Sequence, residues 1–283
     1  LWVDGYSPGS KLWAGTPEVR SKTKVRSVNK TVKFEDLGEL IKVWNADGSS
    51  TEQAEGENSD IILVPVAHFP DPLSSAPEGS DVIHALVLTE VYDLEGNPHT
   101  SNTRHRLAGL AERNKARGLL SGMECEYFAL KDGIPLGWKR HDQVPEQGRN
   151  YCGAGADKVD FRLRALMDAH QYACLKAGLH YAGKNIEVAK GQAEYQLGPV
   201  DPLRLADEVW LSRYLLERVG EQMGIAINLE PKPFTGDVNG SGGHIGFSDA
   251  RIRETGEVSA AYIDRLRGAH SKHIEVYGYG NGK

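Results

Sequence analysis

The chain has 283 residues, of which 40% are hydrophobic and 25% are charged, and its net charge at pH 7 is -6. This composition is typical of a globular protein with one large domain or two unequal ones. The acidic balance argues against a general affinity for nucleic acid, and no apolar run is long enough to span a membrane, so we expect neither partner. The three cysteines, Cys125, Cys152 and Cys174, form no CxxC motif, which predicts reduced thiols in a cytoplasmic protein.

The N-terminal part of the chain has the pattern of strands and turns. Residues 25–32 and 61–66 are rich in β-branched side chains, and the turn sequence Asp47-Gly48-Ser49-Ser50 lies between them. Residues 71–81 are rich in Pro, Ser and Gly, which predicts a linker. We therefore expect a domain boundary near residue 80, with one domain at 1–80 and a second at 81–283.

Beyond residue 80, a strand is predicted at 82–92 and helical periodicity then dominates. Helices are expected at 103–117, with Ser101 as N-cap and Gly118 as its end, and at 161–176, 203–223 and 259–273. The predicted buried stripes of the two longest helices are Phe161, Ala165, Ala169, Tyr172 and Ala173, and Leu205, Val209, Leu216, Val219 and Met223. A strand-rich part followed by mixed strands and helices indicates an α+β or α/β fold.

Two acidic segments stand out between these helices. Glu124 and Glu126 are two residues apart, a spacing that points both side chains to one face of a strand. Two like charges side by side repel each other, and a cation between them reverses the sign of that interaction.

The second segment alternates Gln192, Glu194 and Gln196, and Glu187 precedes it across a natural bend. Clustered carboxylates suit Mg²⁺ and Mn²⁺, with an imidazole tolerated by Mn²⁺. The pattern alone leaves open a solvated acidic face of an exposed sheet.

A glycine-rich segment covers residues 236–243 and ends at His244. Glycines let backbone N–H groups approach a ligand, and His244 could reach a metal. The segment is neither a Walker A loop nor a GxGxxG motif. A flexible surface loop and a ligand-binding loop both remain open on this pattern.

Taken in order, these segments resemble the eukaryotic-type (type II) glutamine synthetases, over essentially the whole chain. The matching stretches include Asp47-Gly48-Ser49-Ser50-Thr51, Glu124-Cys125-Glu126-Tyr127, Leu136-Gly137-Trp138, Tyr151-Cys152-Gly153-Ala154-Gly155-Ala156, Asn185-Ile186-Glu187-Val188, Gln192-Ala193-Glu194-Tyr195-Gln196 and Asn239-Gly240-Ser241-Gly242 with His244. The resemblance implies an α+β protein: an N-terminal β-grasp domain followed by a glutamine synthetase/guanido kinase-like catalytic α/β domain.

The resemblance also implies an activity. Family enzymes ligate ammonium to L-glutamate through γ-glutamyl phosphate and release glutamine, ADP and phosphate. They use ATP as co-substrate and two or three Mg²⁺ or Mn²⁺ ions per site. We therefore expect a cytoplasmic homo-oligomer of stacked rings, a decamer, with active sites between subunits.

Site residues follow by the same resemblance. One metal, near the substrate glutamate, would be held by Glu126, Glu187 and Glu194. A second metal, near the ATP phosphates, would be held by Glu124 and His244. The implied roles are metal binding by Glu124, Glu126, Glu187, Glu194 and His244, glutamate binding by Asn239 and Gly240, and nucleotide binding by Gln196, Ser248 and Arg253. Asp47, reaching from a neighbouring subunit, would bind ammonium and take its proton.

Some positions depart from the family pattern. Ala193 stands where the family usually has Trp, and Gly246 where it often has Asn. After Tyr277-Gly278-Tyr279-Gly280-Asn281 the family continues with an arginine-rich stretch, a flap glutamate and a late metal-binding glutamate, so we expect a shortened or incomplete chain with weak activity of its own. Two alternatives stay open: a γ-glutamyl-amine ligase of the same superfamily, and a catalytically incomplete regulatory or structural subunit.

Overall fold

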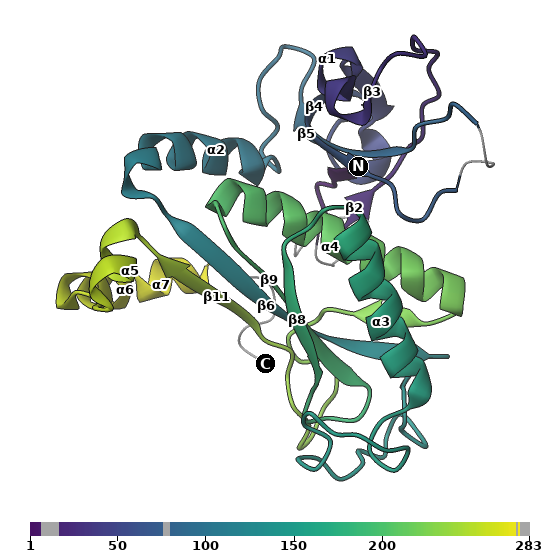
Figure 1. The fold of residues 1–283 in the computed structure, drawn as a ribbon, viewed down its shortest axis with the longest axis vertical. Helices are drawn as coiled ribbons and strands as arrows, with labels where there is room; N and C mark the ends of the chain where they lie inside the picture. Colours follow the sequence, from purple (N-terminus) through teal and green to yellow (C-terminus); the bar gives the residue numbers. More distant parts are fainter. Residues whose placement is uncertain (7–16, 76–79, 276, 278–283) are drawn as a thin grey trace. The chain divides into compact units, whose positions relative to one another are not determined.

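The computed structural model describes residues 1–6, 17–75, 80–275 and 277, which fall into two compact units (Figure 1). The first comprises Leu1–Arg113 with Lys176–Gly178, and the second comprises Asn114–Leu175 with Leu179–Lys283. Residues 76–79 of the predicted linker and 278–281 of the C-terminal motif lie outside the described residues. The domain boundary expected near residue 80 stays a prediction.

In the first unit, β3 (Trp44–Asp47), β4 (Asp60–Pro70) and β5 (Ala85–Tyr92) form an antiparallel sheet in the order β3-β4-β5. Strands β1 (Trp2–Val3) and β2 (Val19–Arg20) form an antiparallel pair. Alternation along β4 buries Ile61 and Leu63, which pack with Trp2, Ala46 and Val91. The expected strand at 61–66 is thus confirmed as part of β4, and the expected strand at 82–92 begins at Ala85.

The other elements of this unit are short. A 3₁₀ turn (Phe34–Asp36) precedes α1 (Leu37–Leu40), whose Leu37 is buried, and a second 3₁₀ turn (Ser49–Thr51) occupies the predicted turn after β3. The predicted strand at 25–32 is wrong: these residues form no strand, and Val25 is 91% exposed. Its valines, Val25, Val28 and Val32, are three and four residues apart and lack the alternation of a strand, and no strand of the described residues pairs with them.

Helix α2 (Thr103–Arg113) is capped by a residue other than the predicted one. The Asn102 Oδ1 accepts a hydrogen bond from the His105 N–H at 3.1 Å, which is the geometry of an N-cap. Ser101 instead accepts a hydrogen bond from the Gln53 amide at 2.8 Å. The helix ends earlier than predicted, at Arg113, and Gly118 with its positive φ instead caps a separate 3₁₀ turn (Lys115–Arg117).

The second unit is built on one antiparallel sheet with β6 (Leu120–Lys131) at its centre. The order is β10-β6-β9-β8, with β9 (Gln192–Val200), β8 (Tyr181–Ile186) and β10 (Ala226–Asn228). Strands β11 (Gly243–Ser248) and β7 (Ile134–Pro135) also pair with β6. This connectivity places β9 beside β6 on one side and β11 beside it on the other.

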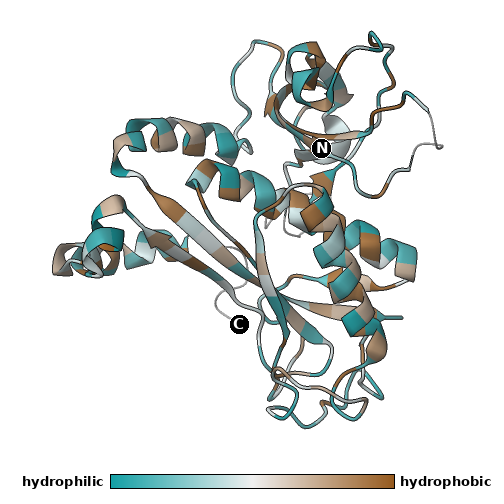
Figure 2. Cartoon of the chain, viewed as in Figure 1, coloured by the Kyte–Doolittle hydropathy of each residue, from teal (hydrophilic) through white to brown (hydrophobic). Residues whose placement is uncertain are grey.

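Helices α3 (Phe161–Lys176) and α4 (Pro202–Met223) pack against this sheet (Figure 1). Helix α4 begins after Asp201, whose carboxylate accepts hydrogen bonds from the Leu203 and Arg204 N–H groups, and it ends at Gly224. Hydrophobic residues recur along both helices between hydrophilic ones (Figure 2). The predicted α4 stripe is buried except for Met223, which is 36% exposed.

The predicted stripe of α3 is wrong except at Ala173. Phe161 and Tyr172 are 79% and 61% exposed, and the buried residues of the helix are Leu163, Leu166, Met167, His170, Ala173 and Cys174. Both sets satisfy a 3.6-residue period, so periodicity alone did not choose between them. The helix contacts its neighbour through His170 Nε2, which lies 3.0 Å from the Ser212 carbonyl of α4.

The predicted helix at 259–273 is divided into two. Helix α5 (Ala250–Thr255) precedes α6 (Ala260–Gly268), and α7 (His270–Ile274) follows after Ala269, whose φ of -106° interrupts the helix. No described helix has both the length and the apolar character of a membrane span. The mixed content confirms the expected α/β character of the catalytic part.

Candidate functional site

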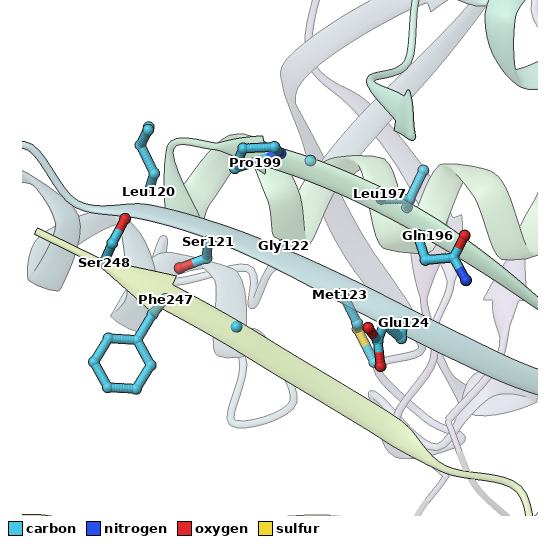
Figure 3. A pocket seen from close by; sticks show the side chains of 12 residues that line it. Leu120, Ser121, Gly122, Met123, Glu124, Gln196, Leu197, Pro199, Phe247 and Ser248 are labelled. Atoms are coloured by element: carbon cyan, nitrogen blue, oxygen red, sulfur yellow. The ribbon is translucent and has the colours of Figure 1, made fainter. Parts of the chain in front are cut away.

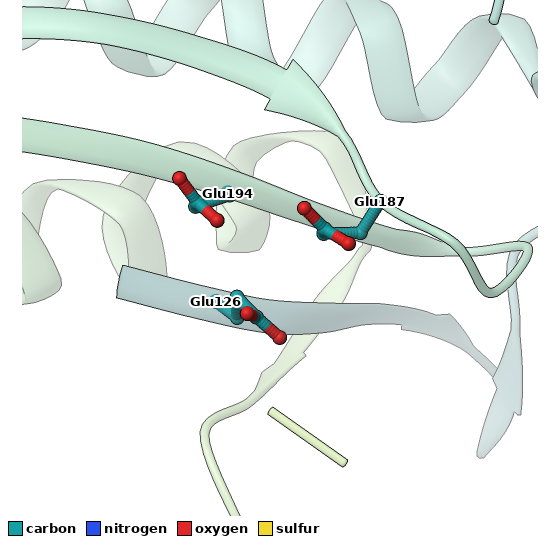
Figure 4. Close-up of side chains that lie close together, drawn as sticks. All are labelled: Glu126, Glu187 and Glu194. Atoms are coloured by element: carbon teal, nitrogen blue, oxygen red, sulfur yellow. The ribbon is translucent and has the colours of Figure 1, made fainter. Parts of the chain in front are cut away.

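Three carboxylates converge on one face of the sheet in the second unit (Figure 4). Glu126 of β6 and Glu194 of β9 are direct cross-strand partners. Glu187 follows the end of β8, and one carboxylate oxygen from each of the three lies within 4.8 Å of the others. The structure therefore brings together the three residues that the family resemblance places around one metal.

Two of the three glutamates are buried and the third, Glu126, is half-buried, and together they carry three like charges. Glu187 and Glu194 are only 6% and 9% exposed. Burial, followed by repulsion from Glu126, raises the pKa of Glu187. Burial, followed by repulsion from Glu124 and Glu187, raises the pKa of Glu194. Among the described residues no Lys or Arg forms an ion pair with the three glutamates, so their mutual repulsion is not compensated by a protein cation.

Side-chain amides orient these carboxylates. The Asn185 amide donates to Glu187 at 2.9 Å, and the Gln196 amide donates to the Asn185 Oδ1 at 2.8 Å and to Glu194. Neutral donors fix the direction of a carboxylate without cancelling its charge. The sequence did not indicate a role for Asn185. The alternation along 192–196 did place Gln196 on the same face as Glu194.

Glu124 and His244 form a separate pair. They are cross-strand partners in β6 and β11, and the His244 Nδ1 lies 3.0 Å from the Glu124 carboxylate. Their side chains are 52% and 66% exposed. The two residues are close enough to share a ligand, as expected from the resemblance, but they offer two donors instead of three.

The glycine-rich segment lies against this face of the sheet. The Gly242 carbonyl accepts a hydrogen bond from the Glu126 N–H at 3.1 Å, and the Gly240 carbonyl accepts one from the Gln192 amide at 2.8 Å. The same Gln192 amide donates to the Glu126 carboxylate at 2.9 Å. Sequence reasoning placed Gln192 on the polar face but assigned it no role.

Further hydrogen bonds hold the segment in place. The Gln147 side chain accepts from the Asn239 N–H at 2.9 Å and donates to the Asp237 carbonyl at 2.7 Å. The Ser241 N–H donates to the Pro231 carbonyl at 2.8 Å. These contacts favour a positioned ligand loop over a free surface loop, and they place Asn239 and Gly240 beside the carboxylate cluster. Nothing in the local sequence identifies Gln147 as a contact of this loop.

An apolar cluster anchors the glycine-rich segment on the sheet. Val238 packs with Phe128 of β6 and Trp138, and the Phe234 ring lies 5.1 Å from each of these two aromatic rings. Because Phe128 is two residues beyond Glu126, its side chain projects from the same face of the strand. The packing therefore fixes the loop at the level of the carboxylates.

An open groove of about 350 Å³ runs along β6, β9 and β11 (Figure 3). Gln196 and Glu124 line one end, and Ser248 lines the other. Arg253 of α5 donates to the Ser248 Oγ at 3.0 Å and to the Gly118 carbonyl at 2.7 Å. Two of the three residues expected to contact nucleotide thus line the groove, and the third is bonded to one of them.

Asp47 belongs to the first unit and ends β3. Its carboxylate accepts hydrogen bonds from the Ser49 N–H at 3.0 Å, the Ser49 hydroxyl at 2.7 Å and the Ser50 hydroxyl at 3.0 Å. These bonds, those from Ser49 first, lower the pKa of Asp47. The exposed side chain is therefore held as a carboxylate, the form that attracts a small cation.

Comparisons with known proteins agree with this arrangement. Residues 100–256 match the family model described as "Glutamine synthetase, catalytic domain". The chain is 42% identical to a glutamine synthetase of Streptomyces viridochromogenes, over 99% of this chain and 76% of that protein. It is 41% identical to one of Emericella nidulans, over 99% of this chain and 73% of that protein.

Similarity extends to a chloroplastic glutamine synthetase of Chlamydomonas reinhardtii, which is 42% identical over 99% of this chain and 72% of that protein. Among solved structures, one described as "GmaS/ADP complex-Conformation 1" has a TM-score of 0.55 at 21% identity. It matches 74% of this chain, which spans 46% of that structure's chain. At this identity the structural likeness supports the fold alone.

Proposed function

Because the chain belongs to the glutamine synthetase family, we propose that Glu126, Glu187 and Glu194 hold a Mg²⁺ or Mn²⁺ ion beside the substrate glutamate. The chain is a glutamate–ammonia ligase, and its family uses ATP, glutamate, ammonium and divalent metal. The proposal is carried by the three carboxylates within 4.8 Å of one another, of which Glu187 and Glu194 are buried and Glu126 is half-buried. Hard divalent cations prefer such oxygen clusters, and a bound cation offsets the burial and the repulsion that raise the pKa values of Glu187 and Glu194.

Glu124 and His244 supply a second, more open metal position in this proposal, near the ATP phosphates. An imidazole beside a carboxylate suits Mn²⁺ and is tolerated by Mg²⁺ less well. When bound, divalent ions screen the repulsion between the ATP γ-phosphate and the substrate carboxylate, so that the carboxylate can attack phosphorus. The residues of this chain then hold the two anions in line.

Substrate positions follow from the neighbouring features. We assign the glutamate to the loop at Asn239 and Gly240, which lies beside the carboxylate cluster. The groove lined by Gln196 and Ser248, with Arg253 at its end, accommodates the nucleotide. The two positions meet at Glu124 and Gln196, where the γ-phosphate faces the glutamate carboxylate.

Asp47, reaching the site from a neighbouring subunit, is proposed to bind ammonium and to take the proton that ammonium releases. Its lowered pKa keeps it ionised, which favours a cation. This role requires active sites between subunits, and we propose the stacked rings of ten subunits expected from the resemblance. Replacement of Asp47 by Asn should raise the KM for ammonium more than the KM for ATP. A comparison of rates with ammonium and with small primary amines distinguishes this enzyme from a γ-glutamyl-amine ligase.

For the first unit we propose the β-grasp arrangement. Its support is that α1 packs on β4 and that the Leu1 main chain is hydrogen-bonded to Val87 and Thr89 of β5, which extends the sheet towards β1 and β2. A cytoplasmic location is also proposed. An experimental structure of the N-terminal unit and fractionation of cells test these two statements.

The metal assignment is tested by phosphate release that requires glutamate, ammonium and Mg²⁺ or Mn²⁺. Glu194→Gln should strongly reduce this activity and abolish the binding of one metal, because it keeps the size of the side chain but removes one of three ligand charges. Glu221→Gln is the matched control, since Glu221 is exposed and pairs only with Arg218 among the described residues. Metal binding unchanged by Glu194→Gln would refute the proposal.

A further inference from the structure

Gln192 is a fully buried side chain that joins two separate parts of the site. It begins β9, it is 0% exposed, and its amide nitrogen donates to the Glu126 carboxylate at 2.9 Å and to the Gly240 carbonyl at 2.8 Å. A primary amide has two N–H hydrogens, so these two bonds use its full donor capacity. One side chain therefore connects a metal-binding carboxylate to the glycine-rich loop.

The orientation of the Gln192 amide is fixed by its surroundings. Its Oε1 faces the Ala189 N–H at 3.4 Å, so the nitrogen is directed to the other side. The Gln192 main chain donates to the Ala189 carbonyl at 3.2 Å and accepts from the Glu187 N–H at 3.0 Å. The residue thus contacts Glu126 through its side chain and Glu187 through its backbone.

A second link joins the same two parts. The Glu126 N–H donates to the Gly242 carbonyl at 3.1 Å, two residues beyond the carbonyl that Gln192 holds. A Cβ on Gly242 would lie 3.1 Å from the Glu126 carboxylate. The loop backbone therefore approaches Glu126 closely, and a shift of the loop changes the surroundings of that carboxylate.

We propose that Gln192 is a positioning residue that couples the metal ligand Glu126 to the glutamate-binding loop. This inference rests on the proposed roles of Glu126 and of the loop at Asn239 and Gly240. A carboxylate held by Gln192 is directed at the cluster only while the Gly240 carbonyl is in place. Filling the loop with glutamate therefore favours the metal-binding geometry, and by thermodynamic linkage the metal tightens glutamate binding by the same factor.

Gln147 provides a matched control for this coupling. It holds the same loop through Asn239 and Asp237, yet within the described part of the chain it forms no hydrogen bond to Glu126, Glu187 or Glu194. Gln147→Met should loosen the loop without touching the metal ligand. Gln192→Met removes the same kind of amide from a position that contacts both.

The test measures Mn²⁺ affinity by titration calorimetry, with and without saturating glutamate, in the unchanged protein and both variants. In the unchanged protein glutamate should tighten Mn²⁺ binding. In Gln192→Met this tightening should fall by about tenfold, the value of one hydrogen bond to a charged group. In Gln147→Met glutamate should bind more weakly but retain its effect on Mn²⁺.

A second variant and a metal-free measurement guard against a folding defect. Gln192→Glu keeps the shape but lacks both donors, so it should also lose the coupling, while the added carboxylate keeps Mn²⁺ affinity without glutamate from falling. Backbone amide exchange at 236–243 should accelerate in the metal-free Gln192 and Gln147 variants. Exchange in α4 should stay unchanged, which shows that the fold is intact.

Two outcomes separate this inference from the proposed function. If Glu126→Gln leaves Mn²⁺ binding unchanged, the metal assignment fails and the coupling fails with it. If Glu126→Gln weakens Mn²⁺ binding but both Gln192 variants keep the full effect of glutamate, the metal assignment stands and the role of Gln192 is overturned.

Discussion

The sheet of the second unit presents two metal-binding candidates that differ in burial and in charge balance. Glu187 and Glu194 of the three-glutamate cluster are 6% and 9% exposed, whereas the Glu124 and His244 side chains are 52% and 66% exposed. Glu124 and His244 satisfy each other through a hydrogen bond, while the cluster contains like charges alone. Burial and uncompensated charge make the cluster the position that depends most on a cation.

The largest expected effect is on the cluster. Glu194→Gln should lower glutamine formation by about a hundredfold to a thousandfold, because the metal loses one of three carboxylate ligands. The same change removes a repelling charge, so the metal-free variant should melt about 2 °C higher or more than the unchanged protein. Activity assays check the expected loss of activity, and calorimetry without metal checks the expected rise in melting temperature. A metal-free variant with a lower melting temperature than the unchanged protein would contradict the repulsion between the glutamates.

At acidic pH the buried His170, on the opposite face of the sheet, should destabilise the folded protein, whereas the glutamate cluster should stabilise it. Burial lowers the pKa of His170 from 6.5 to about 4. The unfolded chain therefore binds this proton below about pH 6.5 and the folded chain does not until about pH 4, so stability falls as the pH drops between these values. We expect a loss of about 2 kcal/mol between pH 7 and pH 5 from this residue.

Urea unfolding of the metal-free protein at the two pH values measures this loss. His170→Gln should flatten the pH dependence even if it lowers stability at every pH. The cluster contributes in the other direction, because raised carboxyl pKa values in the folded state mean that stability is regained as the pH falls through them. In Glu194→Gln the acid-induced loss should therefore be steeper, and an unchanged slope would remove the cluster from this balance.

A smaller effect is expected at the exposed pair. His244→Gln should reduce activity by about tenfold, since Glu124 and solvent remain to bind the second ion. The loss should be recovered in part by a higher metal concentration, which Glu194→Gln should not show. Rate measurements over a range of Mg²⁺ concentrations distinguish the two behaviours, and equal recovery in both variants would contradict the difference between the sites.

The smallest effect is expected in the groove. A Cβ added at Gly246 meets no atom within 4 Å, so Gly246→Asn should change the free energy of unfolding by less than about 0.5 kcal/mol. The new amide lines the groove and should lower the KM for ATP by about threefold. A large loss of stability would show that the groove is closed in solution, and an increased KM would place the nucleotide elsewhere.

The sequence predicted the clustering of the acidic residues better than it predicted the helix packing. The period of a strand places Glu124 and Glu126 on one face, and the order of motifs identified the family. By contrast, the buried face of α3 was missed, because a helix with Ala, Leu and aromatic residues on several faces offers more than one apolar stripe.

Contacts between distant segments were also beyond local pattern. That Gln192 reaches Glu126 depends on the pairing of β6 with β9, and its bond to Gly240 depends on how the loop folds back. Residues 25–32 were predicted as a strand from their composition, but a strand requires a neighbour, and within the described part of the chain none pairs with them. The order of motifs thus indicated the family, while the partners of individual side chains required the three-dimensional structure.

The central claim is that the three-glutamate cluster is the tighter of two metal positions. Calorimetric titration of the metal-free protein with Mn²⁺ tests it most directly. We predict two classes of site that differ by about tenfold or more in affinity, with the tighter class lost in Glu194→Gln and the weaker class weakened further in His244→Gln. Two sites of equal affinity, or a tight site that survives Glu194→Gln, would contradict the account.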